Sequence, residues 1–563
     1  MKNPSWVVFT IAVIWSVVAG QNGATSLSFN FVDIASDAGL REPTIYGGVA
    51  AKKYIVETNG SGVAFFDFDN DNWLDIFIMS GTRLEGFEKG KEPTNRLYRN
   101  NRNGTFKDVT ENSGLRKTGW ASSVTVGDFD NDGFEDLFLT YWGENVLYRN
   151  NQNGIFSDVT DRSGLKQTAT RWGSGAAFID YDRDGDLDLF VANYLKFDFA
   201  KVPEAGKGAN CLWKGIMVNC GPKGLPTDTN ILYENKGGGV FADVSDKSGI
   251  AGVTGRYSMT AIVTDYNNDG WPDIYVACDS TASTLYRNNR NGTFTDVSLD
   301  SGTAYNEDGN AQAGMGVTIG DYDADGRPDI FKTHFADDLP ILYRNSGRDF
   351  FEDASRLAGF DHTKHVQWGT GFADFDNDGW VDIMTVTGNV YPEIERFFKE
   401  YPHRGPRLVY QNQGNGRFKD VSAYAGSGIS TPRSSRGAAF GDFDNDGDID
   451  VLVMNMNDPP LLLRNDLRSK NGWLKLKLVG TKSNRSAIGA RVTLRTGKHV
   501  QVQEVTSQSS YYSHNDARVH FGLGSAREAD SVEIRWPGGQ TEMLKNVAAN
   551  QIVRVKEGSG MVR

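Results

Sequence analysis

The residues most able to do chemistry in this chain are aspartates that recur in one short pattern. The six residues DFDNDG occur at 128–133, 374–379 and 442–447, and four further segments are close variants of them. Such closely spaced carboxylates repel one another unless a cation lies between them. Alternate carboxylates followed by a glycine, which permits a sharp turn, are typical of a Ca2+-binding loop. The pattern therefore predicts sites for a hard cation.

Each nine-residue loop is expected to supply oxygen ligands from positions 1, 3, 5 and 9, with a backbone carbonyl at position 7. Six loops carry four carboxylates, and the fourth loop has Asn267 at position 3. The predicted metal ligands are Asp67, Asp69, Asp71 and Asp75; Asp128, Asp130, Asp132 and Asp136; Asp180, Asp182, Asp184 and Asp188; Asp265, Asn267, Asp269 and Asp273; Asp321, Asp323, Asp325 and Asp329; Asp374, Asp376, Asp378 and Asp382; and Asp442, Asp444, Asp446 and Asp450.

Up to seven Ca2+ ions are expected, because Mg2+ prefers fewer protein ligands and a stricter octahedron. The alternative is a set of solvated acidic turns without metal, which would leave the repelling carboxylates unneutralised. Seven divalent cations would also offset the formal net charge of -13. In the first loop, Asn72 stands where the others have glycine, and asparagine tolerates a left-handed backbone better than most residues.

The acidic loops belong to a larger repeat of about 52 residues, interrupted by insertions. Downstream of each of the first six loops comes a second signature, as in LYRNNRNGTFKDVTENSGL at 97–115. Each unit is interpreted as four short strands, with the acidic loop between the first and second. Four short strands in each of seven such repeats predict the blades of a closed β-propeller.

The two ends of the repeat region support a ring. The seventh unit lacks its fourth strand, but FVDIASDAGL at 31–40 aligns with FKDVTENSGL at 106–115. We therefore expect the N-terminal strand to complete the last blade and remove the open edges of the array. The fold class predicted is all-β, a seven-bladed propeller over 27–468 followed by a small β domain over 470–557.

The first twenty residues resemble a secretory signal peptide. Lys2 precedes a mostly apolar run from Trp6 to Ala19, which is too short for a membrane span. An uncleaved anchor is the alternative. The expected mature protein is secreted or extracytoplasmic and has no transmembrane span. In an oxidising compartment Cys211 and Cys220 could form a local disulfide, which leaves Cys278 as a buried thiol.

The repeats resemble the FG-GAP/VCBS type, whose calcium loops are best known from the propellers of integrin alpha chains. Residues 484–555 resemble an ASPIC/UnbV domain. Together these features resemble the cartilage acidic protein family. Vertebrate members carry an EGF-like module after this tail, whereas here the sequence ends at Arg563 and looks more like the bacterial versions. Read on its own, the tail alternates as β-strands, with no metal site expected and with His514 and His520 interpreted as surface residues.

Function is expected on the face opposite the acidic loops. The long insertions at 80–95, 194–229 and 388–407, and the linkers at 303–313 and 360–367, all fall on that face. Loops on a rigid scaffold commonly carry binding. The candidate ligand-face residues are Trp120, Arg171, Trp172, Arg256, Tyr257, His334, Trp368, Tyr391 and Arg436. For the aromatic residues among them, one interpretation is a platform that binds a sugar or a peptide. The other interpretation, which is favoured here, is packing between blades.

Three functions fit these features. The first is a secreted calcium-dependent binding or adhesion module for an extracellular glycan or protein. The second is an enzyme, a lyase or hydrolase, with its active site at the mouth of the propeller channel. The third is a structural protein that acts by assembly. The acidic composition argues against nucleic acid as a partner, and no catalytic constellation is recognisable in the sequence.

Overall fold

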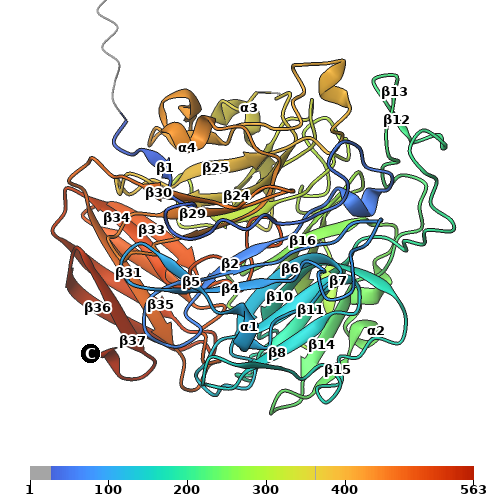
Figure 1. Cartoon of the computed structure of the whole chain (residues 1–563). Helices are drawn as coiled ribbons and strands as arrows, with labels where there is room; N and C mark the ends of the chain where they lie inside the picture. The colour runs from blue at the N-terminus through green and yellow to red at the C-terminus, as the bar shows by residue number, and fades with distance from the viewer. Residues whose placement is uncertain (1–26, 362, 563) are drawn as a thin grey trace, which may run out of the picture.

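The computed structural model describes residues 27–361 and 363–562, and it is built almost entirely from β-strands (Figure 1). The expected signal peptide lies outside the described residues. Among the described helices none is long and apolar enough to cross a membrane. The few helices are single turns: α1 (Thr110–Ser113), α2 (Ser245–Ser248), α3 (Ser355–Ala358), α4 (Ser427–Ser430), and the 3-10 turns η1 (Ile55–Glu57), η2 (Ile250–Gly252), η3 (Ile394–Arg396) and η4 (Ser422–Tyr424).

The repeat region forms antiparallel groups of four strands, one for each acidic loop, and the groups of the second and third loops are joined into one eight-stranded sheet. In order they are β2 (Val63–Phe66), β3 (Asp75–Ile78), β4 (Arg96–Asn100) and β5 (Phe106–Asp108); β6 (Trp120–Gly127), β7 (Asp136–Gly143), β8 (Val146–Asn150) and β9 (Phe156–Asp158); β10 (Arg171–Ile179), β11 (Asp188–Asn193), β14 (Ile231–Asn235) and β15 (Phe241–Asp243); β16 (Ser258–Thr264), β17 (Asp273–Cys278), β18 (Thr284–Asn288) and β19 (Phe294–Asp296); β20 (Val317–Gly320), β21 (Asp329–Lys332), β22 (Ile341–Asn345) and β23 (Phe351–Asp353); β24 (Gln367–Ala373), β25 (Asp382–Thr387), β26 (Leu408–Asn412) and β27 (Phe418–Asp420); and β28 (Ser435–Gly441), β29 (Asp450–Asn455), β30 (Leu461–Asn465) and β1 (Phe31–Asp33).

These groups, which we call blades 1 to 7, are arranged around a common centre. Their first strands contact one another in the cyclic order β2, β6, β10, β16, β20, β24, β28 and back to β2. The N-terminal strand β1 pairs with β30, so that Phe31 lies opposite Asn465 and Asp33 opposite Leu463. The strand that precedes blade 1 in the sequence thus completes the last blade, as expected. This pairing covers the edge of β30 that would otherwise be unpaired where the two ends of the repeat region meet.

The inner strands of five blades carry a β-bulge that the sequence pattern did not predict. In blade 2, for example, the register shifts between Ala121 and Val124, and in blade 6 between Gln367 and Thr370. A bulge inserts one extra residue and so interrupts the alternation of side chains between the two faces of a strand. Residues before and after a bulge therefore cannot be assigned to the same face by counting every second position.

The C-terminal region forms two further sheets. One sheet has the order β34-β31-β37-β38 and the other the order β33-β32-β35-β36. Their bounds are β31 (Gly472–Val479), β32 (Arg491–Thr496), β33 (His499–Glu504), β34 (Val519–Gly524), β35 (Glu528–Arg535), β36 (Thr541–Ala548), β37 (Gln551–Lys556) and β38 (Gly560–Val562). Strand β31 runs parallel to β37, and the other pairs in these sheets are antiparallel. Figure 1 shows these strands, in orange and red, lying beside the inner strands of the repeat region.

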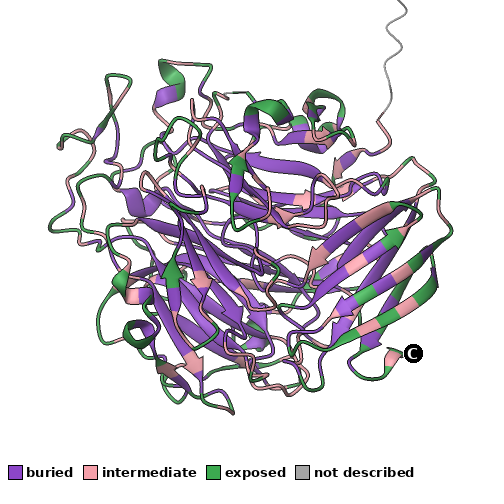
Figure 2. Cartoon of the chain, turned by 180° about the vertical axis from the view of Figure 1, so that it is seen from behind, coloured by how far each residue is buried: buried purple, intermediate pink, exposed green. Residues whose placement is uncertain are grey.

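One segment of this domain, Val505–Asp516, enters the centre of the ring. It connects β33 to β34 and makes backbone hydrogen bonds with several inner strands: Ser510 pairs with Val317, the Val124 amide donates to the Tyr512 carbonyl, and the His514 amide donates to the Val63 carbonyl. The Ser507 hydroxyl donates to the Phe178 carbonyl at 2.8 Å. We call this segment the central plug. Figure 2 shows that the strands around it are almost wholly buried.

The C-terminal domain buries two residues, one in the plug and one in β34, that the sequence analysis placed at the surface. The interpretation of His514 and His520 as surface residues is wrong, because they are only 2% and 5% exposed. The Nδ1 atom of His514 lies 2.7 Å from the Ser507 carbonyl, and Nε2 of His520 lies 3.1 Å from the Gly447 carbonyl in the seventh acidic loop. Burial lowers the pKa of His514 to about 4 and that of His520 to about 3, so both rings are neutral at pH 7.

A glycine substitution tests the position of the plug. A Cβ atom added at Gly62 would lie 1.7 Å from the Tyr512 carbonyl oxygen, so Gly62→Ala must displace the plug. We expect this variant to lower the free energy of unfolding by about 1–3 kcal/mol, as overpacked interiors do, measured by denaturant titration. Gly252→Ala is the matched control, because nothing lies within 4 Å of its added Cβ. Equal stability of the two variants would contradict the plug.

Candidate metal centres and the opposite face

The acidic loops hold their carboxylates in one repeated arrangement. In blade 2, the position-1 carboxylate of Asp128 accepts the amides of Asp132 at 2.9 Å and Gly133 at 2.7 Å. The position-9 carboxylate of Asp136 accepts the amides of Asn150 at 2.7 Å and Phe129 at 3.2 Å. These backbone amides thus hold the carboxylates of positions 1 and 9 in place. Positions 3 and 5 lie between them in the sequence.

Two positions of each loop need a left-handed backbone. Position 6 is glycine in six loops, and in the first loop Asn72 adopts φ 67°, the conformation for which asparagine was expected to be tolerated. Position 4 is also left-handed, with φ between 56° and 62°, a requirement that the sequence analysis did not identify. Asparagine occupies position 4 in five of the loops: Asn70, Asn131, Asn268, Asn377 and Asn445. The recurrence of asparagine at position 4 could have revealed this requirement from the sequence.

The position-3 carboxylates provide a direct test of whether the loops fit a cation. In five loops the Oδ1 atom at this position is buried and has no hydrogen-bond partner among the described residues: Asp69, Asp130, Asp323, Asp376 and Asp444. Burying an unpaired anionic oxygen is costly unless a cation or hydrogen bond compensates it. In blades 1 and 2, for instance, oxygens of Asp67, Asp69 and Asp71, and of Asp128, Asp130 and Asp136, lie within 4.8 Å of one another. The donor set and the spare oxygens fit a hard divalent cation.

Burial has a clear electrostatic effect on these groups. It raises the pKa of the position-1 carboxyls of Asp128, Asp180 and Asp321 to about 7, with neighbouring carboxylates of the same loop contributing in the same direction. Burial likewise raises the pKa of the position-9 carboxyls of Asp136 and Asp188 well above their usual range. Without a cation, these loops therefore favour protonated carboxyls.

The LYRN signature acts on the loops in two ways that the sequence analysis did not foresee. Its arginine neutralises the outer oxygen of position 3: Arg99 lies 2.7 Å from Asp69, and Arg344 lies 2.7 Å from Asp323. Its asparagine links neighbouring blades. The Asn150 amide donates through Nδ2 to the carbonyl of Phe68, which is position 2 of the preceding loop, at 2.8 Å. The same bond recurs from Asn100, Asn235, Asn288, Asn345, Asn412 and Asn465.

The C-terminal domain covers the face that carries the acidic loops. Lys475 lies 2.7 Å from the position-1 carboxylate of Asp442, and both side chains are fully buried. Lys477 lies 3.0 Å from Asp67, and Arg535 pairs with Asp265. At blades 2, 5 and 6 the contacts are uncharged or made to backbone carbonyls, as between the His499 ring and the Gly379 carbonyl at 2.7 Å. This face is therefore an interface between domains.

On the opposite face, most of the predicted ligand residues are buried. Trp172 and Arg436 are fully buried, and Trp368 is 2% exposed. Trp120, Tyr257, His334 and Tyr391 are also buried, whereas Arg171 and Arg256 are partly exposed and lie near Asp228 and Asp296. Trp172, Trp368 and Arg436 lie beside or within the β-bulges of their inner strands, in the interior of the molecule. The aromatic residues pack against one another both within and between blades: Trp172 contacts Tyr194 of its own blade edge to face at 5.0 Å, and Tyr194 contacts Tyr257 of the next blade at 6.1 Å between ring centroids.

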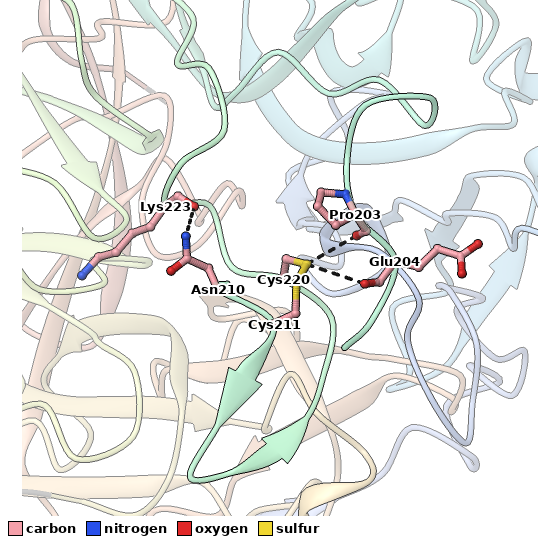
Figure 3. The surroundings of a disulfide bond; sticks show 6 residues. All are labelled: Pro203, Glu204, Asn210, Cys211, Cys220 and Lys223. Atoms are coloured by element: carbon pink, nitrogen blue, oxygen red, sulfur yellow. Dashed lines mark hydrogen bonds between the residues drawn. A yellow bond between two sulfur atoms is a disulfide. The ribbon is translucent and has the colours of Figure 1, made fainter. Parts of the chain in front are cut away.

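The insertion at 194–229 instead presents a hairpin formed by β12 (Leu212–Trp213) and β13 (Ile216–Met217). The expected disulfide between Cys211 and Cys220 closes its base (Figure 3), and Cys278 is a buried thiol, as expected. Trp213 anchors the hairpin by contacting Tyr401 at 5.0 Å. Leu212 and Met217 are 57% and 67% exposed, and Figure 1 shows the hairpin projecting on the side away from the C-terminal sheets.

Removing one position-3 ligand tests the cation assignment. Asp130→Ala deletes the buried oxygen that has no partner, so we expect one fewer Ca2+ bound per chain, measured by equilibrium dialysis with elemental analysis. At a hundredfold excess of Ca2+ over its dissociation constant, the lost stabilisation is about 3 kcal/mol. Asp161→Ala is the control, since Asp161 is exposed in the same blade and pairs with Lys166. Unchanged stoichiometry in Asp130→Ala would contradict the site.

The pH dependence of stability provides a second test. Because the folded-state pKa of Asp128, Asp180 and Asp321 is about 7 and the unfolded value is about 3.9, the folded chain binds more protons between these values. In chelator, the free energy of unfolding should therefore fall as pH rises from 5 to 8. Added Ca2+ should stabilise the protein more at pH 8 than at pH 5. Denaturant titrations at both pH values measure this, and a chelated protein that is equally stable at pH 5 and pH 8 would refute it.

Comparisons with known proteins agree with the architecture. The FG-GAP-like repeat model matches residues 67–139, 128–191, 265–331 and 402–453, and the ASPIC and UnbV model matches 480–562. Cartilage acidic protein 1 of Mus musculus is 24% identical over 524 residues, which cover 88% of this chain and 73% of the mouse protein. The Homo sapiens protein is 25% identical over 493 residues, covering 69% of this chain and 72% of the human protein.

Among solved structures, a lectin from Agrocybe aegerita that recognises non-reducing terminal N-acetylglucosamine aligns over 83% of this chain and 100% of its own, with a TM-score of 0.37 and 15% identity. The BP39L lectin from Burkholderia pseudomallei covers 73% of this chain, with a TM-score of 0.43 and 10% identity. These distant likenesses carry no functional argument. The FG-GAP-like repeats, the ASPIC and UnbV domain at 480–562, and the similarity to cartilage acidic protein 1 over most of the chain support placing this chain with the cartilage acidic protein family.

Proposed function

We propose that the protein is a secreted calcium-binding propeller that acts as an extracellular binding or adhesion module through its insertion-bearing face. The partner proposed is a glycan or protein of the extracellular space. The observation that carries this proposal is the contrast between the two faces. The C-terminal domain covers the acidic-loop face, while the insertion face presents exposed apolar side chains on a disulfide-closed hairpin.

Calcium is proposed to have a structural role. The loops that would hold it carry the ion pairs to the C-terminal domain, so an ion there would lie at the interface between the propeller and that domain. Neutralising the carboxylates would stiffen the ring and the docked domain together. Up to seven ions are proposed. The fourth loop fits least well, because Asn267 replaces a carboxylate and donates from Nδ2 to Asp269 at 3.1 Å, and Arg535 already pairs with Asp265.

The disulfide supports export. A bridge between Cys211 and Cys220 persists in oxidising compartments and is rare in the cytosol. It also lowers the entropy of the hairpin that it closes, and a rigid apolar tip binds a partner at a smaller ordering cost than a flexible one. Phe397, which is 61% exposed in the insertion at 388–407, adds apolar surface to this face.

The enzyme alternative receives less support. The aromatic residues that would have lined an open channel mouth are packed inside the molecule, and the plug fills the channel from the other side. His334, the one histidine among the candidate ligand-face residues, is buried, and neither ring nitrogen has a hydrogen-bond partner in the described part of the chain. No observation among the described residues favours a catalytic pair at the mouth.

Substitutions on the hairpin test the proposed binding face. The double variant Leu212→Asp, Met217→Asp should lose at least tenfold in affinity for a partner found on an array of extracellular glycans and matrix proteins, because charges replace the apolar contact. Its melting temperature and Ca2+ stoichiometry should stay those of the wild type. Leu357→Asp is the matched control, since Leu357 is 78% exposed beside the fourth strand of blade 5. Equal loss in both, or no loss in the hairpin variant, would refute the assignment of the hairpin.

A further inference from the structure

A buried arginine at the centre of the ring has no carboxylate partner. Arg436, in the inner strand β28, is 0% exposed. Its Nε donates to the Thr58 carbonyl at 2.8 Å, and Nη1 donates to the Ser435 carbonyl at 2.8 Å and the Gly388 carbonyl at 3.2 Å. The Nη2 atom has no hydrogen-bond partner among the described residues. The guanidinium carbon lies 4.1 Å from the centroid of the Trp368 ring.

The charge of Arg436 is therefore stabilised only by neutral groups. Burial lowers its pKa to about 9, and the groups that oppose this effect are the phenols of Tyr511 and Tyr46. Two other buried arginines have a carboxylate partner: Arg491 lies 2.9 Å from Glu504, and Arg518 lies 2.8 Å from Asp516. Arg407, which is also buried, donates to the carbonyls of Ile429 and Thr431. A buried cation without a counter-charge is strongly destabilising, and proteins normally pair it.

The plug brings further unused donors to the same place. The rings of Tyr511 and Tyr512 stack with centroids 3.9 Å apart, and Tyr511 contacts Trp368, the ring on which Arg436 lies, with centroids 5.0 Å apart. Both phenol hydroxyls are buried without a hydrogen-bond partner among the described residues, and so is Nδ2 of Asn59. Asn59 follows Thr58, whose carbonyl accepts from Arg436. The Asn59 side chain lies close enough to the Tyr512 hydroxyl to oppose the rise in its pKa that burial causes.

A carboxylate that acts on these groups is already used. Asp279 acts electrostatically on Tyr512, but its two oxygens accept the Tyr194 hydroxyl at 2.5 Å and the Ser280 hydroxyl at 2.8 Å. The site thus combines a positive charge that has no ion-pair partner among the described residues with several polar groups that can donate. Water could satisfy the donors, but it would leave the charge of Arg436 uncompensated.

We propose that a small monovalent anion, a halide or a carboxylate, binds between Nη2 of Arg436, the hydroxyls of Tyr511 and Tyr512, and the Asn59 amide. Two of these groups belong to the propeller and two to the C-terminal domain. The anion is therefore enclosed when the plug enters the ring, and it acts as a counter-ion that holds the two domains together.

Crystals of the full chain grown in sodium bromide test the site directly. We expect an anomalous bromine peak in contact with Nη2 of Arg436, or the planar density of a carboxylate retained from purification, and crystals grown in sodium acetate separate the two sources. Refinement of water molecules alone at this position, with no anomalous peak and no carboxylate density, would overturn the proposal.

Thermal unfolding provides an independent readout at fixed ionic strength and fixed Ca2+. Replacing gluconate, which is too large for the site, by chloride or bromide should raise the wild-type melting temperature by about 1 °C for each tenfold increase above the dissociation constant. The variant R436M should lose this dependence, and the control R491M should keep it despite its lower stability. If R436M does not fold, the double variant Y511F, Y512F serves instead and should weaken the halide effect. A wild-type melting temperature that is the same in gluconate and in halide would count against the anion.

Discussion

Most of this structure depends on compensating the mutual repulsion among buried carboxylates. Each acidic loop places aspartates where the first and second strands of a blade meet, with several oxygens buried and without a protein partner. Backbone amides, the arginine of the LYRN signature and cations of the C-terminal domain each compensate part of that charge. The oxygens that remain point to a common centre, which is where a divalent cation supplies the missing compensation.

The same loops join the parts of the molecule. The asparagine of each LYRN segment links its own loop to the preceding one, so charge balance in one blade is connected to the packing of the next. Lys475 and Lys477 carry this connection to the C-terminal domain, whose plug then occupies the centre of the ring. The tail domain thereby depends on the acidic loops for its docking surface. The proposed binding role is assigned to the opposite face, which carries the insertions.

Local patterns in the sequence predicted the features that depend on local physics. The acidic loops, the four-strand repeats, the return of residues 31–33 to the last blade and the Cys211–Cys220 bridge all follow from spacing and residue type. The tolerance of Asn72 for a left-handed backbone follows in the same way. Each of these is decided within a few residues or by alignment of one repeat with another.

Features that depend on docking could not be predicted in that way. Alternation in WLKLKL identifies strand β31 but does not reveal that Lys475 faces a buried aspartate. The bulges beside Trp172 and Arg436 leave no mark in the composition of their strands, so the sequence did not reveal how these side chains are buried. The plug residues YYSHND look like a polar surface loop in the sequence. Only the central space of the ring, formed by residues hundreds of positions away, makes them an interior segment.

Hydrogen–deuterium exchange, followed by mass spectrometry with and without Ca2+, tests the central claim most directly. If cations in the acidic loops hold the ring and the tail domain together, removal of Ca2+ should increase exchange in the loops and also in the plug, Val505–Asp516, although the plug contains no predicted ligand. Exchange in the hairpin at 211–220 should not change. Protection of the loops and plug that is the same in Ca2+ and in chelator would contradict the account.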